Sequence, residues 1–106
     1  MCRFITTEAP RIAAESTQRY RLVAIARLGK SIWIGTNRPG RHAEVAAIKQ
    51  VPYERRSDVS LTVLRYRKDN DQLALAKPCK ACQAFLSANK VTTIFYSTDD
   101  LTLARL

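Results

Sequence analysis

Apolar positions along the chain alternate between short dense runs and stretches with helical spacing. The dense runs, rich in apolar and β-branched residues, predict four strands, over residues 20–28, 31–35, 59–67 and 91–96. Between them, stretches with apolar residues on one face predict three helices, over residues 7–19, 41–50 and 79–89. Because helix and strand signals alternate in this way, we expect an α/β fold in which helices pack on a sheet.

Turn-forming residues indicate how these elements connect. Gly29-Lys30 is short enough to join the first two strands in a tight reversal. Residues 68–71 turn the chain after the third strand, and residues 73–76 then run extended. A short fifth strand is expected within residues 101–106, and it must pair antiparallel because the loop before it is too short for a parallel crossover. The pattern therefore predicts a mixed sheet of four to five strands whose last pair is antiparallel.

The length and charge of the chain narrow its class. One domain, residues 1–106, accounts for the whole length, and 46% apolar residues support a compact core and exclude wholesale disorder. No apolar run approaches the roughly 18 residues of a membrane span, and the N-terminal residues lack the apolar block of a signal peptide, so we expect a cytoplasmic protein. The formal charge of +9 favours a polyanionic partner such as nucleic acid or a phosphorylated metabolite, although a basic excess can also serve solubility alone.

The three cysteines of the chain are an odd number and cannot form a closed disulfide set. Cys79 and Cys82 have a C-x-x-C spacing, which in an intracellular protein indicates either a redox pair or metal ligands. Cys2 lies beside the N-terminus and is expected to be an idle thiol.

Two short motifs stand where helices are predicted to begin. His42-Ala43-Glu44 opens the helix over 41–50, and Pro78-Cys79-Lys80-Ala81-Cys82 opens the helix over 79–89. In an open α/β sheet, such junctions line the crevice at the strand ends, so the two motifs can converge. One imidazole and two thiolates would then form a three-ligand zinc site with an open fourth position, which is typical of catalytic zinc.

Glu44 adds a second part to this prediction. It lies two residues from His42 and is poorly placed to bind the same ion, but it can carry a proton from the zinc water to a ring nitrogen and then to a departing amine. Three alternatives to a catalytic zinc site stay open. The H-x-E motif can be coincidental, the C-x-x-C motif can be a redox pair, and a structural zinc could take Cys2 as a fourth ligand.

With H-x-E followed by P-C-x-x-C, the chain resembles the zinc-dependent cytidine deaminase superfamily, for which this pair of motifs is the signature. The resemblance extends from the first predicted helix to the fourth strand. It implies a three-layer sandwich and the hydrolytic conversion of cytosine to uracil. It also implies zinc ligands at His42, Cys79 and Cys82, with Glu44 as the proton carrier.

Individual segments resemble different branches of that superfamily. Residues 37–44 share N-x-x-G-x-H-x-E with polynucleotide deaminases of the AID/APOBEC type, and residues 78–83 look closer to free-nucleoside deaminases. Asn37 matches an asparagine that holds the target sugar in several branches, or is simply a turn residue. The compact chain as a whole resembles small deaminase-like proteins of phages and bacteria. It departs from the pattern at Lys77, at Arg38 after Asn37, and in having no room for a late helix.

Cations and aromatic residues near the motifs bear on the substrate. Four positive side chains flank the motifs and would suit a phosphate-bearing substrate, namely Arg38, Arg41, Lys77 and Lys80. Trp33 and Tyr96 are candidate stacking partners for a base, or part of the core. Arg65 and Arg67 share one face of the third strand, where they either extend a basic track or are merely solvated.

These observations predict a Zn²⁺-dependent deaminase of cytosine in single-stranded nucleic acid, with DNA favoured over RNA. The alternative is a deaminase of free cytidine, deoxycytidine or their monophosphates that acts as a homo-oligomer. A third hypothesis is a basic zinc module that binds nucleic acid without catalysis, although a structural zinc has no use for Glu44. No membrane partner is expected.

Overall fold

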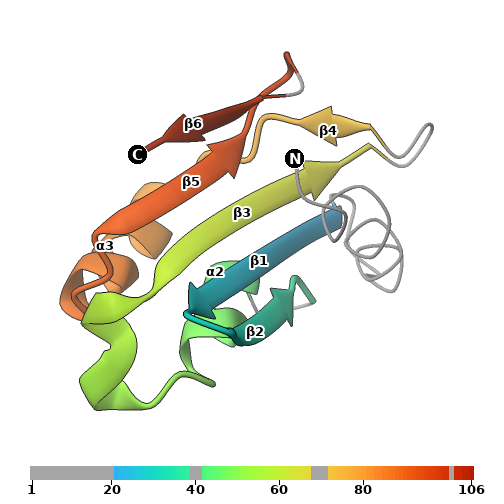
Figure 1. Ribbon diagram of the computed structural model, residues 1–106. Coiled ribbons are helices and arrows are strands. Elements are labelled where there is room, and N and C mark those ends of the chain that lie inside the picture. The colour runs from blue at the N-terminus through green and yellow to red at the C-terminus, as the bar shows by residue number, and fades with distance from the viewer. Residues whose placement is uncertain (1–20, 39–41, 68–71, 101) are drawn as a thin grey trace.

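The computed structural model describes residues 21–38, 42–67, 72–100 and 102–106 (Figure 1). Along these residues the strands are β1 (Arg21–Leu28), β2 (Ser31–Thr36), β3 (Ser60–Tyr66), β4 (Leu73–Ala74), β5 (Thr93–Ser97) and β6 (Leu103–Arg105). The α-helices are α2 (Ala43–Ile48) and α3 (Lys80–Ala88), and a 3-10 helix, η2 (Tyr53–Asp58), follows α2. No helix within these ranges is long and apolar enough to cross a membrane.

The strands form one mixed sheet in the order β2-β1-β3-β5-β6. The β1–β2, β1–β3 and β5–β6 pairs are antiparallel, whereas β3 and β5 are parallel and are joined through α3. This arrangement confirms the predicted α/β fold and its antiparallel last pair. The short strand β4, which lies within the segment predicted to run extended, pairs with β3 and makes the sheet six-stranded.

The main core lies between the sheet and the two α-helices, which share one face of the sheet (Figure 1). Buried side chains from α2, α3 and alternate positions of the strands meet there, among them Ala24, Ala47, Leu61, Val63 and Leu86. The opposite face carries a second buried cluster of Val23, Ile25, Leu64, Tyr66 and Leu73. Because both faces are buried, β1 is apolar at nearly every position rather than at alternate ones.

Gly35 allows α2 to lie very close to β2. A Cβ at Gly35 would lie 2.5 Å from the backbone N of Ala47, a contact that a real side chain could not make. The helix can therefore approach the strand only because this position has no side chain. That close approach sets the position of the N-terminal end of α2, where the H-x-E motif lies.

Most predicted elements agree with the structure to within two residues at either end. The helix predicted over 41–50 is α2, and the helix predicted over 79–89 is α3. The polar turn η2 was not predicted. The helix expected over 7–19, which would add a further layer to the sandwich, lies outside the described residues.

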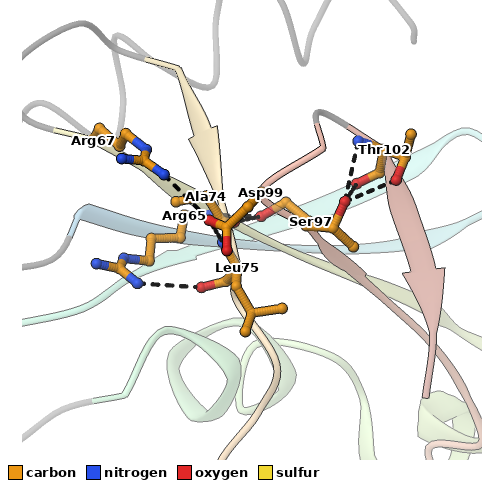
Figure 2. Close-up of polar contacts among 8 residues, drawn as sticks. Arg65, Arg67, Ala74, Leu75, Ser97, Asp99 and Thr102 are labelled. Atoms are coloured by element: carbon orange, nitrogen blue, oxygen red, sulfur yellow. Dashed lines mark hydrogen bonds and ion pairs between the residues drawn. The ribbon is translucent and has the colours of Figure 1, made fainter.

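The partner of β3 changes partway along the strand. Residues 60–63 pair with β5, and Arg65 and Tyr66 pair with β4. At this junction the fully buried Ser97 hydroxyl accepts a hydrogen bond from the Arg65 backbone N and donates one to the Ala74 carbonyl. Ser97 thus joins three strands at the point where the chain leaves β4 for the cysteine motif (Figure 2).

Candidate metal centre

An open cavity of about 180 Å³ lies where the helix N-termini meet the end of the sheet. It is formed by the start of β1, the end of β3, the segment between β4 and α3, and the first turns of both α-helices. The lining residues are Leu22, His42, Glu44, Val63, Arg65, Leu75, Ala76, Lys77, Pro78, Cys79 and Cys82. Both sequence motifs therefore reach one cavity, as predicted from their positions at helix starts.

His42, Cys79 and Cys82 form the centre of this cavity. The ligand atoms that they offer, one imidazole nitrogen and two Sγ atoms, all lie within 4.8 Å of one another. His42 and Cys79 each occupy the N-cap position of a helix, and Cys82 lies in the first turn of α3. Cys82 is buried, whereas His42 and Cys79 are exposed, so a ligand bound to the trio would be reached from the cavity side.

The donor set fits a borderline-soft divalent cation. Tetrahedral zinc with ordinary bond lengths would hold its nitrogen and sulfur ligands about 3.5 to 3.8 Å apart. The upper limit of 4.8 Å is therefore within about 1 Å of what such coordination requires. The described part of the chain offers three ligands in this cluster, so a tetrahedral ion would keep a position open to the cavity.

The protonation of the Cys82 thiol depends on the groups around it. Burial raises its pKa well above the usual range, and the negative charge of Glu44 and the neighbouring Cys79 raise it further. Hydrogen bonds with the side chains of both residues also favour the protonated thiol. Two cysteine sulfurs and a carboxylate thus lie close together, and a bound cation would stabilise their charged forms.

Glu44 lies in the first turn of α2, beside the three candidate ligands. Only 4% of its surface is exposed, yet it is part of the cavity lining. A buried carboxylate that faces a cavity next to metal ligands is suited to accept and donate a proton at a substrate held there. The role of Glu44 as a proton carrier stays a prediction.

Asn37 is buried and anchors the start of β1. Its Oδ1 accepts a hydrogen bond from the Leu22 backbone N at 3.0 Å, and its own backbone N donates to the Leu22 carbonyl at 3.4 Å. These bonds extend the β1–β2 ladder by one residue. Since Leu22 lines the cavity, Asn37 supports the cavity wall through the backbone of its neighbour.

Neither predicted stacking residue, Trp33 or Tyr96, is among the residues that line the cavity. Trp33 pairs with Ala26, four positions along β1 from Leu22, or roughly 13 Å. It packs against the main core and is not part of the cavity lining. Tyr96 pairs with Val63, which does line the cavity, and its ring also packs on the core.

The four predicted rim cations do not all reach the cavity. Lys77 lines it, whereas the exposed Arg38 and Lys80 are not among the lining residues. Arg41 lies outside the described residues. Arg65, which was predicted only to extend a basic track or be solvated, lines the cavity instead. The available signal was the even spacing that puts Arg65 and the buried Val63 on the same face of β3.

The segment from Leu75 to Pro78, which lines the cavity, is held by hydrogen bonds to residues that are not part of the lining. The Asp99 carboxylate accepts a hydrogen bond from the Leu75 backbone N at 3.1 Å, and the Ala76 backbone N donates to the Ser97 carbonyl at 2.9 Å. Asp99 also pairs with Arg67 at 3.4 Å (Figure 2). These bonds hold the backbone that leads directly into the cysteine motif.

Comparison with known proteins does not supply a family. No protein-family model matches the chain, and no curated protein or solved structure matches it either. The functional assignment therefore depends on the two motifs and on the geometry of the described residues.

Proposed function

We propose that this protein is a zinc-dependent hydrolytic deaminase that converts cytosine to uracil in single-stranded nucleic acid, most favourably DNA. The observation that carries the proposal is the convergence of His42, Cys79 and Cys82 beside the buried Glu44 in one open cavity. A redox pair would explain the two thiols but neither the imidazole nor the carboxylate. The charge of +9 supports a polyanionic substrate.

The roles of the residues follow from their positions. A zinc ion held by His42, Cys79 and Cys82 supplies a Lewis acid that acidifies water. Glu44 accepts the proton that this water loses and delivers it to the N3 nitrogen of cytosine. The oxygen of the water bonds to C4 of the base, and Glu44 then carries the second proton of that oxygen to the exocyclic amine. The amine leaves as ammonia when its bond to C4 breaks and the carbonyl of uracil forms. One water is consumed for each ammonia released.

The size of the cavity agrees with a single base as the group that enters it. Its volume of about 180 Å³ is below the roughly 300–1,000 Å³ of pockets that enclose drug-sized ligands. The sugar and phosphates of a substrate would then lie outside the cavity, against its rim. In a nucleic acid the target base must be unpaired or extruded to enter, which favours single strands.

A second candidate is deamination of free deoxycytidine or cytidine monophosphate. It is favoured by the presence of only two cations, Arg65 and Lys77, in the described cavity lining, since two cations are enough for one phosphate. An assay panel of cytosine oligonucleotides, nucleosides and monophosphates separates the two candidates. Turnover of the oligonucleotide that falls steeply as salt rises supports the polynucleotide function, and turnover of monophosphate alone contradicts it.

Substitution of Glu44 tests catalysis itself. Glu44→Gln should lower turnover at least 100-fold while the bound zinc stays stoichiometric. Glu54→Gln is the matched control, because Glu54 is exposed in η2 and should not affect turnover. Full activity in Glu44→Gln would exclude the proposed proton transfer. Zinc-bound wild-type protein that binds oligonucleotide but deaminates nothing would favour a non-catalytic zinc module.

A further inference from the structure

Arg65 is the one cation of β3, and it differs from the nearby Arg67 in its position relative to the cavity. Its side chain is on the same face as Val63, two residues before it, and both line the candidate zinc cavity. Arg67, which directly follows β3, has the same residue type but is not part of the lining, and it pairs with the Asp99 carboxylate at 3.4 Å. Of these two neighbouring arginines, one lines the cavity and the other lies outside its lining.

The backbone and the side chain of Arg65 are both held in place. Its backbone N donates to the buried Ser97 hydroxyl at 3.1 Å, at the junction of β3, β4 and β5. Its Nη1 donates to the Leu75 carbonyl at 3.4 Å, on the segment that covers the cavity (Figure 2). Because a guanidinium carries five N–H donors in a rigid fork, one such anchor orients it and is compatible with two bonds to phosphate oxygens.

Charge in the cavity favours an anion beside the base. Two thiolates would nearly neutralise a bound Zn²⁺, and Glu44 adds one negative charge. Arg65 and Lys77 are the cations of the described lining, and together they leave the cavity with a net positive charge. A positive charge does not attract neutral cytosine strongly, whereas it does attract the negatively charged phosphate next to the sugar.

We propose that Arg65, together with Lys77, forms a phosphate subsite at the mouth of this cavity and holds one phosphate of the substrate while its base lies at the candidate zinc. The proposal rests on the proposed function for the placement of the base. The phosphate is a diester in a polynucleotide or a monoester in a free nucleotide. Arg65 provides the fork for two phosphate oxygens, and Lys77 provides a point charge.

Binding measured without turnover tests the subsite. All variants are made in the Glu44→Ala background, loaded with zinc, and titrated with a fluorescein-labelled oligodeoxythymidine that contains one cytosine. Arg65→Gln should raise the Kd about tenfold and reduce the slope of log K against log salt by about 0.7, the value for one phosphate of a single strand. Arg67→Gln is the matched control and should change the Kd less than twofold. Arg65→Lys should keep the salt slope but lose part of the affinity.

Competition with small ligands identifies which phosphate is bound. If the subsite takes a monoester, deoxycytidine monophosphate displaces the oligonucleotide better than deoxycytidine does, and Arg65→Gln removes the difference. If it takes only a diester, the two small ligands compete equally while Arg65→Gln still weakens oligonucleotide binding. Either result supports a phosphate at Arg65.

Two outcomes would overturn the subsite. One is an unchanged Kd for the oligonucleotide and for both small ligands in Arg65→Gln, with the variant shown to be folded by its thermal transition and zinc content. The other is an equal loss in Arg65→Gln and Arg67→Gln, which would indicate a diffuse basic surface. Since binding is read without deamination, a failed activity assay in the wild type would contradict the proposed function and leave this result standing on its own.

Discussion

Glu44 and Cys82, which come from the first turns of two different helices, meet at one buried position in the cavity. The carboxylate lies close enough to raise the pKa of the thiol and to hydrogen-bond with it. This contact exists because α2 and α3 pack side by side on the same face of the sheet. The proposed proton carrier and a proposed metal ligand are thereby held beside each other before any ion binds.

The raised pKa of Cys82 predicts how the stability of the metal-free protein depends on pH. Between about pH 9, where the thiol of an unfolded chain ionises, and the higher pKa of the folded state, the folded chain binds one more proton than the unfolded chain. The free energy of unfolding should therefore fall with rising pH in this range, by about 1.4 kcal/mol per pH unit from this group. Below about pH 9 the Cys82 thiol adds no pH dependence to the free energy of unfolding.

Urea unfolding at pH 7.5 to 10.5, in chelator and reductant, measures this dependence. The difference in unfolding free energy between wild type and Cys82→Ala isolates the contribution of this thiol from those of other groups that ionise in the same pH range. Saturating zinc should remove the effect, because a bound cation stabilises the thiolate. Parallel pH profiles of the two metal-free proteins would contradict the assignment.

Removal of individual cysteines should distinguish the candidate centre from a structural zinc with four protein ligands. Cys79→Ala should lower the zinc affinity at least 100-fold, because a site of three protein ligands loses one of its two thiolates. Cys2→Ala should leave the affinity unchanged, since Cys2 is not required for an open site. Chelator competition followed by elemental analysis provides both values. An equal loss in the two variants would indicate a closed site that includes Cys2.

Gly35 should prove essential for the geometry of the candidate metal centre although it is not one of the candidate ligands. In Gly35→Ala the new methyl group would lie 2.5 Å from the Ala47 backbone N, so α2 must move away from β2. We expect a loss of about 1–3 kcal/mol in unfolding free energy and weaker zinc binding, because His42 and Glu44 move with the helix.

Gly29→Ala is the control for this effect. Gly29 has a φ of +59° in the β1–β2 turn and no atom within 4 Å of its Cβ position. Alanine there should cost about 1 kcal/mol through backbone strain and leave the zinc affinity unchanged. If both variants weaken zinc binding equally, stability and not the position of α2 controls the site.

Asp99 should stabilise the segment from Leu75 to Pro78, which lines the cavity. Asp99→Ala removes the acceptor for the Leu75 backbone N and should lower the unfolding free energy by about 0.5–1.5 kcal/mol. Hydrogen exchange of the Leu75 backbone amide should become faster in the same variant. Asp99→Asn retains an oxygen acceptor and should restore slow exchange, because its exposed ion pair with Arg67 contributes little. Fast exchange in Asp99→Asn as well would show that the charge, and not the hydrogen bond, holds the segment.

The sequence by itself determined most of the elements and the candidate metal ligands of this protein. Dense apolar runs predicted the strands because β1 and β3 are buried, and local turn residues such as Gly29 set the connections between them. The pairing of β6 with β5 followed from the length of the loop alone. The motifs around His42 and Cys79 identified the candidate ligands because each motif is local and opens a helix.

Only the tertiary structure decided which side chains surround the cavity. Arg65 and Lys77 line it while Lys80 does not, and Trp33 lies far along β2, because these positions depend on sheet register and on the packing of distant elements. The change of partner along β3, with Ser97 at the junction, likewise joins segments that are remote in the chain. Local sequence patterns do not predict such contacts, because the contacts are set by the packing of one element against another.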